Sequence, residues 1–244
     1  MAIKIKGLII KETKVGEGDK IITMLTSELG IIQAAAKGAR SYKSKFLAGC
    51  QLFCYTAFDL REKTKLFSVV SAEPIHTFYE IRNDFERLSL AVYFCDLLNE
   101  IGTDLHNADT MLSLALNTLY LLSKSTNLTQ LKATFELRLI CETGFAPELY
   151  SCVKCGNKSD NNFISTQDGG MLCNTCSSQT NILPGTLSAM RHIISAPLKK
   201  TFSYHTDNKV LLELKTITEN YLLYQIDKFP RSLKYYHRLT KSRE

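Results

Sequence analysis

The sequence has no long apolar run and no recognisable secretion signal. None of its segments approaches the roughly 20 consecutive apolar residues that a membrane-spanning helix needs. The apolar stretch nearest to the N-terminus, residues 8–10, lies between lysines. A signal peptide would need a longer apolar segment followed by a cleavage site. We therefore expect a cytoplasmic protein, in a compartment where thiols are kept reduced.

The sequence motifs of several enzyme classes are also missing. The glycine-containing segment 16–20 is too short for a Walker A loop and lacks its Gly-Lys-Ser/Thr ending. There is no Lys-x-Asp-Gly motif of the kind that transfers nucleotides in DNA ligases, and no His-x-Glu accompanies the cysteines as it does in zinc deaminases. The histidines are scattered: His76, His106, His192, His205 and His237. The sequence therefore predicts a protein that is not an enzyme.

Positive charge is concentrated at the two ends of the chain. The whole sequence has 30 basic and 24 acidic residues. Residues 1–46 hold nine basic and four acidic side chains, residues 228–244 hold six and one, and the rest holds fifteen and nineteen. Clustered Lys and Arg raise the local potential and displace counterions from phosphates. Charge alone leaves two interpretations open, which are contact with a polyanion and two solvated surfaces.

Residues 3–72 have the pattern of short β-strands. A first strand covers 3–6 and 8–10, and apolar or β-branched runs follow at 21–26, 31–36, 52–60 and 66–71. Turn-forming residues at 16–19, 30 and 62–64 separate them. Because no space remains for crossover helices, the sheet must be mostly antiparallel. We predict an α+β protein of two domains, with a five-stranded OB-type barrel in residues 1–79. A small SH3-like barrel fits the pattern nearly as well.

After Pro74 the hydrophobic period changes to that of helices. Apolar stripes at helical spacing cover 85–95, 112–122, 131–139 and 210–224. Asp84 is placed to cap the first of these helices, and Gly144 with Pro147 should terminate the third. We therefore predict a helical domain over residues 80–244, whose stripes form its core.

Two C-x2-C pairs predict a metal site. Cys152 and Cys155 are separated by seventeen residues from Cys173 and Cys176, the spacing of a four-cysteine zinc site. Each pair forms a tight turn that presents two thiolates, and the loop between them completes a tetrahedron. Four cysteine ligands leave no open position, so we predict one structural zinc ion in segment 148–182. The alternatives, two disulfides or four free thiols, fit a reducing compartment less well. The remaining cysteines are interpreted as small core residues: Cys50, Cys54, Cys95 and Cys141.

Residues 37–46, here called the basic loop, predict contact with nucleic acid. The segment follows the third strand, contains no acid and carries four cations: Lys37, Arg40, Lys43 and Lys45. Such cations pair with phosphates, while Tyr42 and Phe46 offer rings for base stacking, as in single-strand binding. A solvated loop without a ligand is the alternative.

The C-terminal segment repeats this combination of cations and tyrosines. Its cations are Arg231, Lys234, Arg238, Lys241 and Arg243, and Tyr235 and Tyr236 lie between them. The pattern also fits a last helical turn that docks through Leu233, Tyr236 and Leu239. The sequence does not distinguish DNA contact from packing here.

The order of four motifs resembles the RecO family of bacterial recombination mediators. Residues 7–30 contain a Gly-Glu-x-Asp turn at 16–19, and residues 36–40 read Ala-Lys-Gly-Ala-Arg, followed by Lys43-Ser44. Residues 144–149 read Gly-Phe-Ala-Pro-Glu-Leu ahead of the first cysteine pair, and residues 231–234 read Arg-Ser-Leu-Lys. The resemblance covers nearly the whole chain. It departs from the family at 49–53, which lacks the proline common before the fourth strand.

The resemblance implies an OB-fold followed by a helical domain with a zinc segment. It also implies binding to single- and double-stranded DNA, and annealing of complementary strands without ATP. The implied partners are RecR and the single-stranded-DNA-binding protein, and, less directly, RecF and the recombinase RecA, which members help to load. Some members lack the cysteines, which implies that zinc is not the DNA-binding element.

Two other functions remain open on residue chemistry alone. One is an RNA-binding or translation-related OB-fold protein with a structural zinc, because phosphate contacts and stacking serve both nucleic acids. Competition between matched single-stranded DNA and RNA would distinguish it. The other is an adaptor whose basic ends bind acidic protein tails. Loss of DNA binding with partner binding kept, when Lys37 and Arg40 are mutated, would argue against it.

Overall fold

The chain packs into two compact units. The computed structural model describes residues 2–62, 66–102, 108–158, 162–177 and 182–241. Unit 1 comprises Met1–Lys124 with Pro230–Glu244, and unit 2 comprises Ser125–Phe229. In sequence, unit 2 is therefore an insertion into unit 1. Parts of the predicted 62–64 turn and of segment 148–182, together with His106 and Arg243, lie outside the described residues.

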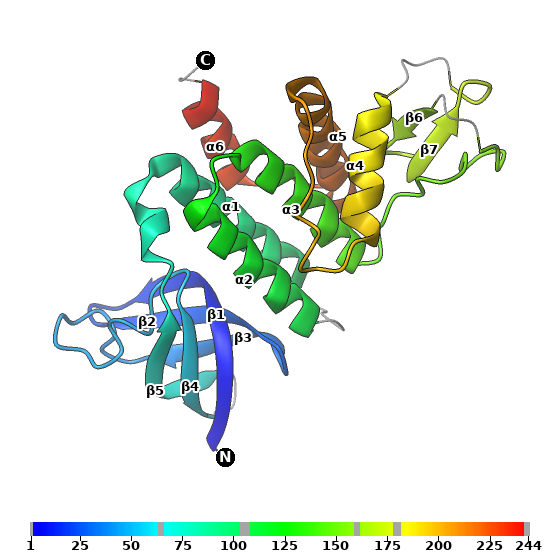
Figure 1. Ribbon diagram of the computed structural model, residues 1–244. Helices are drawn as coiled ribbons and strands as arrows, with labels where there is room; N and C mark the ends of the chain where they lie inside the picture. The colour runs from blue at the N-terminus through cyan, green and yellow to red at the C-terminus, as the bar shows by residue number, and fades with distance from the viewer. Residues whose placement is uncertain (1, 63–65, 103–107, 159–161, 178–181, 242–244) are drawn as a thin grey trace. The chain divides into compact units, whose positions relative to one another are not determined.

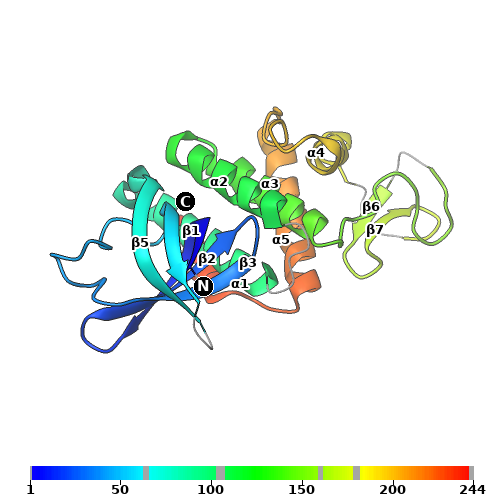
Figure 2. The ribbon, with the colours of Figure 1, turned by 90° about the horizontal axis from the view of Figure 1, so that it is seen from below.

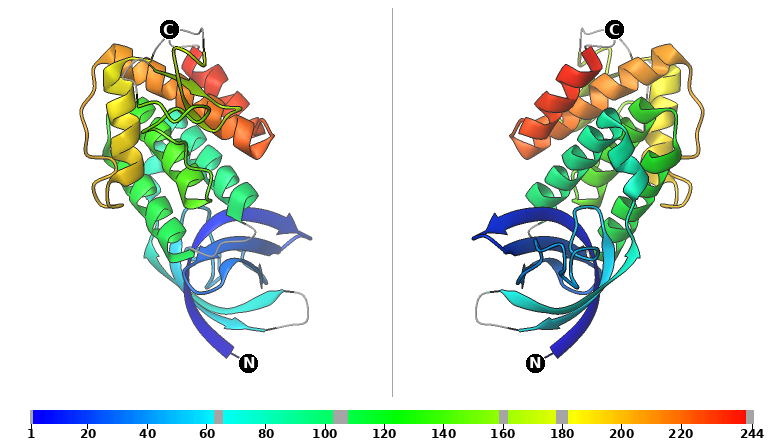
Figure 3. Two further views of the ribbon diagram at one scale, coloured as in Figure 1. Left: turned by 90° about the vertical axis from the view of Figure 1, so that its right-hand side faces the viewer. Right: turned by 90° about the vertical axis from the view of Figure 1, so that its left-hand side faces the viewer.

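The N-terminal region of unit 1 is the predicted OB-type barrel (Figure 1). Its strands are β1 (Ala2–Val15), β2 (Asp19–Thr26), β3 (Gly30–Ala36), β4 (Tyr55–Arg61) and β5 (Phe67–His76). They close in the order β1-β2-β3-β5-β4, and β1 pairs with both β2 and β4. Ala2 lies opposite Arg61, so β1 begins beside the end of β4. In Figure 3, N marks the end of the chain at which β1, in blue, begins. Four pairings are antiparallel, whereas the short β3–β5 pairing is parallel.

Several strand boundaries differ from the prediction; β5, for example, continues to His76 instead of ending at residue 71. β1 is one continuous strand of 14 residues, and its pairing with β2 shifts register between Ile9 and Lys11. Such a bulge bends a strand, which helps β1 to serve two neighbours in a closed barrel. The fourth strand begins at Tyr55, not at residue 52. Phe53 has a φ of 66° and Cys54 N–H donates to the carbonyl of Gln51, so this segment turns before it pairs.

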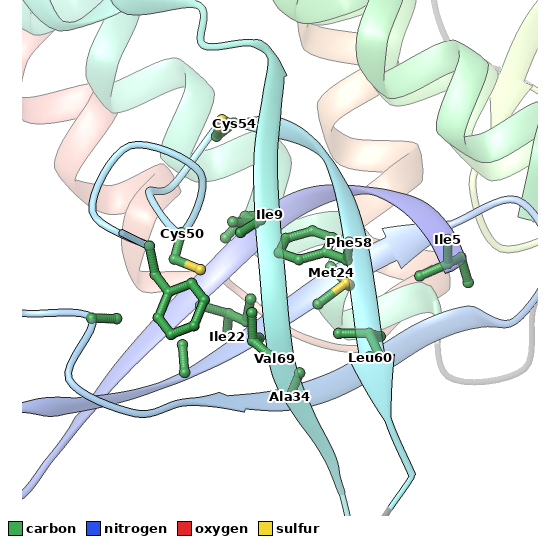
Figure 4. Close-up of a cluster of buried hydrophobic side chains, with 14 residues drawn as sticks. Ile5, Ile9, Ile22, Met24, Ala34, Cys50, Cys54, Phe58, Leu60 and Val69 are labelled. Carbon is green, nitrogen blue, oxygen red and sulfur yellow. The ribbon is translucent and has the colours of Figure 1, made fainter. Parts of the chain in front are cut away.

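Alternating side chains from all five strands fill the barrel (Figure 4). Ile9, Ile22, Met24, Phe58 and Leu60 belong to one buried cluster. Cys50 and Cys54 lie in the same cluster, in line with their interpretation as small core residues. Burial of large apolar side chains on this scale supplies the main driving force for a domain of this size.

Helices complete unit 1. They are η1 (Tyr79–Asn83), α1 (Phe85–Ile101), α2 (Ala108–Lys124) and α6 (Arg231–Lys241). The side chain of Asp84 accepts hydrogen bonds from the backbone N–H groups of Glu86 and Arg87, so it caps α1 as predicted. α1 packs against β1, α2 and α6 (Figure 1). The C-terminal helix is therefore part of the unit that contains the barrel.

Unit 2 combines helices with a small hairpin (Figure 2). Its elements are α3 (Leu128–Glu142), β6 (Asn162–Ser165), β7 (Gly170–Cys173), α4 (Pro184–Ser195) and α5 (Asn208–Ile226). α3 ends ahead of Gly144, as predicted. The sequence analysis missed α4, although proline at a helix start and buried Leu187, Met190 and Ile193 at intervals of three are helix signals.

A charged triad lies buried inside unit 2. The ammonium of Lys132 on α3 lies 2.6 Å from a carboxylate oxygen of Glu136 and 2.5 Å from one of Glu219 on α5. The side chains of Lys132 and Glu136 are fully buried.

Among the residues that the structure describes, none of the helices has the length and apolar character that a bilayer crossing requires.

Candidate metal centre and nucleic-acid interface

The β6–β7 hairpin positions the cysteine pairs. Cys173 ends β7 opposite Asn162, and the turn that carries Cys152 is bound to β7 by Val153 N–H, which donates to the carbonyl of Met171. The chain entering this turn also lies against β7, because Met171 N–H donates to the carbonyl of Glu148 at 2.8 Å. A Cβ atom at Gly170 would lie 2.5 Å from that carbonyl oxygen, so this approach requires glycine.

Each cysteine pair folds into a tight turn. Gly156 N–H donates to the carbonyl of Cys152 at 2.8 Å, and Cys176 N–H donates to the carbonyl of Cys173 at 2.9 Å. Gly156 has a φ of 73°, the backbone conformation that its position after the first pair predicts. The first cysteine of each pair is buried against Leu172, whereas Cys155 is exposed and Cys176 is half-buried.

The four sulfur atoms can hold a metal ion. All four Sγ atoms lie within 4.8 Å of one another, and Cys155 Sγ lies 3.5 Å from Cys173 Sγ. A tetrahedral zinc–thiolate site with bonds of about 2.3 Å places its sulfurs about 3.8 Å apart. The structure therefore brings together the four residues that the spacing singles out, in an arrangement that a tetrahedral ion fits.

The thiols of this cluster do not ionise equally. A hydrogen bond from the backbone of Cys173 helps to lower the pKa of Cys152 to about 6. The pKa of Cys176 is raised to about 12, chiefly by its hydrogen bond with Cys155. Adjacent thiolates repel each other, so a set in which all four are ionised needs a cation among them.

Hydrogen bonds hold the basic loop against the turn between β1 and β2. Gly38 N–H donates to the carboxylate of Asp19 at 2.8 Å. Arg40 donates twice, from its backbone N–H to the carbonyl of Gly18 at 3.0 Å and from Nη1 to the carbonyl of Gly16 at 2.9 Å. Two motifs that are far apart in sequence therefore form one surface.

The predicted cations of the basic loop are exposed, but one of its two rings is not. The side chains of Lys37, Arg40, Lys43 and Lys45 face solvent. Tyr42 is 80% exposed, and Lys43 Nζ lies 5.5 Å from the centre of its ring. Phe46, in contrast, belongs to the buried barrel cluster, so the expectation that it offers a stacking face is wrong. Its ring anchors the loop, because a loop residue that fills the core gains burial energy.

Two exposed lysines of β1, Lys11 and Lys14, were not among the predicted cations. Lys14 lies opposite Lys20, and Lys20 lies opposite Ala36, the residue before the basic loop. Lys20 pairs with Glu12 at 2.6 Å, whereas Lys11 and Lys14 are exposed on β1. Both lysines follow the last apolar residue of the predicted strand. A prediction that continued this strand to Val15, where β1 ends, would have included them.

The cations of the C-terminal segment lie on one face of α6, here called the α6 stripe. Arg231, Lys234, Arg238 and Lys241 recur at intervals of three and four residues and are exposed. Leu233 and Tyr236 are buried, and they lie away from the stripe. The two interpretations of this segment are thus compatible, because one face of α6 packs while the other presents cations.

Comparison with known proteins gives a consistent result. The family model "Recombination protein O N terminal" matches residues 1–78, and "Recombination protein O C terminal" matches residues 82–234. A "DNA repair protein RecO" of Acetivibrio thermocellus is 37% identical over 232 residues, covering 93% of this chain and 92% of that protein. Proteins of the same name from Alkaliphilus metalliredigens and Caldicellulosiruptor bescii are each 31% identical, over 93% and 90% of this chain and 95% and 91% of their own lengths.

Proposed function

The chain belongs to the RecO family of DNA repair proteins, and on that premise we propose that it binds single- and double-stranded DNA and anneals complementary strands without ATP. The observation that carries this proposal is the basic loop. It combines four exposed cations, no acid and the exposed ring of Tyr42, and hydrogen bonds hold it on the barrel.

We assign DNA binding to the barrel region, residues 1–79, with the α6 stripe as a second contact. The charge of the two units supports this assignment. Unit 1 holds 20 basic and 15 acidic residues, whereas unit 2 holds ten and nine. Within the helical region, residues 80–244, segment 148–182 then has a structural role.

Annealing follows from the chemistry of these groups. Two complementary strands repel each other through their phosphates, and exposed Lys and Arg side chains reduce that repulsion by displacing counterions. Stacking on Tyr42 keeps a base unpaired and accessible without reading its identity. Because base pairing is itself favourable, no nucleotide hydrolysis is needed, and we propose that the protein is not an enzyme.

We propose that the cysteine cluster holds one structural zinc ion through Cys152, Cys155, Cys173 and Cys176. An ion bound to four thiolates supplies binding energy that folds the segment around it. The fit of the sulfur positions to a tetrahedron supports that role, as does the small size of the apolar cluster around the cysteines, in which Leu172 and Phe163 are the other described members. Four protein ligands leave no position for water, so the ion would not be catalytic.

Family membership supports a set of partners. We propose that the protein acts with RecR and the single-stranded-DNA-binding protein in the cytoplasm, on DNA of the nucleoid. RecF and RecA would then be indirect partners, since loading of RecA would be the result of the reaction.

An annealing assay tests the proposed function. Complementary DNA strands coated with the single-stranded-DNA-binding protein should anneal faster when the purified protein is added without nucleotide. A requirement for ATP, or hydrolysis of ATP by the purified protein, would contradict the proposal. Matched RNA strands, used as competitors, would show whether the preference is for DNA.

Replacement of three lysines tests the assigned surface. Lys37, Lys43 and Lys45 are preferable to Arg40, whose guanidinium also holds the loop to the β1–β2 turn. Changing all three to Ala should flatten the salt dependence of single-strand binding by about two units, at about 0.7 for each lost phosphate contact. A matched variant with Lys158, Lys199 and Lys209 of unit 2 changed to Ala should keep the wild-type slope. A folded triple variant of the loop with an unchanged slope would place the DNA elsewhere.

A further inference from the structure

We propose that the basic loop and the α6 stripe are two separate DNA sites of different specificity. The basic loop takes an unpaired strand, whereas the α6 stripe takes the sugar-phosphate backbone of a strand whether or not it is paired. This inference rests on the proposed function and goes further, because it assigns a class of substrate to each site.

The two sites have different supports. The basic loop is held by Phe46 in the barrel core and by hydrogen bonds to the β1–β2 turn. The α6 stripe is held by α1, against which α6 packs, with Leu233 and Tyr236 buried. The basic loop and the α6 stripe thus rest on different elements of unit 1, so that either site can be mutated without removing the support of the other.

The basic loop has the chemistry of a single-strand site. Tyr42 is the most exposed large aromatic or aliphatic side chain of the described residues, at 80%, and it stands among four cations. A base can stack on this ring only if its own face is free. In a duplex the base faces are already covered by their neighbours, so the stacking energy is available to unpaired strands alone.

The α6 stripe has the chemistry of a backbone site. Its cations are fixed on a regular helix that rises about 1.5 Å per residue, so Arg231 and Lys241 are separated by about 15 Å along the axis. That length corresponds to four or five nucleotides of one strand in a duplex, at about 3.4 Å each. A row of cations contacts phosphates, which single and double strands both present.

Tyr235 needs separate consideration because it lies beside the stripe and is 57% exposed. A long side chain on a regular helix leans back over the preceding turn, so one face of the Tyr235 ring lies along α6, whereas Tyr42 stands on a loop and is 80% exposed. We therefore assign stacking to Tyr42 and not to Tyr235. The consequence is a protein that holds an unpaired strand at the loop while a second strand, or the duplex product, occupies α6.

Two variants test this assignment by fluorescence anisotropy with a labelled single strand and a blunt duplex of equal length. Tyr42→Ala should weaken single-strand binding roughly 5- to 150-fold for each base that loses its stacking partner, and leave duplex binding within about twofold. A variant with Arg231, Lys234 and Lys241 changed to Ala should weaken both ligands, and duplex binding at least as much as single-strand binding, because a single strand can still bind the basic loop. Tyr224→Ala, an exposed aromatic of unit 2, is the matched control and should change neither.

Three results would overturn the inference. Equal loss of both ligands in Tyr42→Ala would show that the loop does not select unpaired strands. A loss of single-strand affinity in Tyr235→Ala as large as in Tyr42→Ala would show that α6 also takes unpaired bases. Loss of single-strand affinity alone in the α6 variant, with duplex affinity kept, would show that the stripe is not a general backbone site.

A competition experiment tests whether the sites are separate. Wild-type protein bound to a labelled single strand should keep part of it when saturating unlabelled duplex is added, because the duplex occupies the α6 stripe and does not enter the basic loop. Complete displacement would mean that the two ligands share one site. It would refute the inference but not the proposed function, because both ligands would still bind. Failure of wild-type protein to bind either ligand would instead refute the proposed function.

Discussion

The DNA-binding cations that we assign to unit 1 and the ion-paired triad of unit 2 lie in opposite environments. The cations of unit 1 that we assign to DNA are exposed, and the barrel beneath them is closed by an apolar core. Unit 2 buries Lys132 between two carboxylates and relies on a cluster of thiols beside a short hairpin. Exposed charges contribute little to stability, whereas a buried charge that loses its partner is strongly destabilising. Unit 1 can therefore vary its cations for binding, while unit 2 must keep its polar residues to stay folded.

The largest effect is expected at the cysteine cluster. Cys155→Ser removes an exposed ligand, so little packing is lost, yet the protein should lose its metal and segment 148–177 should exchange its amide hydrogens much faster. Metal binding of this type contributes about 10–16 kcal/mol in isolated zinc modules. Elemental analysis and hydrogen exchange measure the two effects, and the barrel should be unaffected. Cys141→Ser is the matched control in the same unit and should retain one zinc. Wild-type protein without metal and with four free thiols would disprove the site.

A smaller but still large effect is expected at the buried triad. Lys132→Met leaves Glu136 buried without its partner and should lower the free energy of unfolding by about 3–5 kcal/mol in urea melts. Lys209→Met, an exposed lysine of the same unit, should have little effect. An equal change in both variants would mean that the triad does not stabilise unit 2.

The triad also predicts a pH dependence. Burial alone would lower the pKa of Lys132, but Glu136 and Glu219 raise it overall above its ordinary value. Because the pKa is higher in the folded state, the stabilisation is fully present below the pKa of the unfolded chain and disappears as the pH rises through the folded value. The difference in stability between wild type and Lys132→Met should therefore persist at neutral pH and shrink in alkaline solution.

A moderate effect is expected where α6 joins unit 1. Leu233 is fully buried, so Leu233→Ala should destabilise unit 1 by about 2–5 kcal/mol. The neighbouring change Lys234→Ala, on the exposed face, should leave the melting temperature unchanged and weaken DNA binding. If Leu233→Ala proved as stable as wild type, α6 would be a ligand-binding appendage and not part of the unit.

The smallest effect on stability is expected at Asp19. Asp19→Ala removes the acceptor for Gly38 N–H and should cost about 1 kcal/mol, because one hydrogen bond in a partly exposed turn is lost. The Gly38 amide should exchange faster and single-strand binding should weaken, since the basic loop is no longer held in place. Asp19→Asn keeps an acceptor oxygen and should largely restore both. Equal loss in both variants would indicate that the negative charge matters, and not the position of the loop.

Much of the architecture could be predicted from local sequence patterns. The spacing of the two cysteine pairs, the alternation along 3–10 and the capping position of Asp84 each depend on a few neighbouring residues. Backbone geometry at such positions is determined within one or two turns of chain, which is why these predictions agree with the structure. A small, mostly antiparallel barrel follows from the number of strands and the lack of crossover helices, whereas the choice between the OB type and the SH3-like alternative required the observed strand order.

The features that define the candidate DNA surface depended on contacts between distant residues. Phe46 belongs to a polar loop by sequence, but it is buried because the barrel has room for its ring. Asp19 and Gly38 are bound to each other only because β2 and β3 pair in a fixed register. Likewise, α6 belongs to unit 1 although all of unit 2 precedes it in the sequence after α2. Its apolar face is shielded from water by packing against α1. The sequence thus determined which residues are cationic, aromatic or metal-binding, whereas long-range packing decided which of them are available to a ligand.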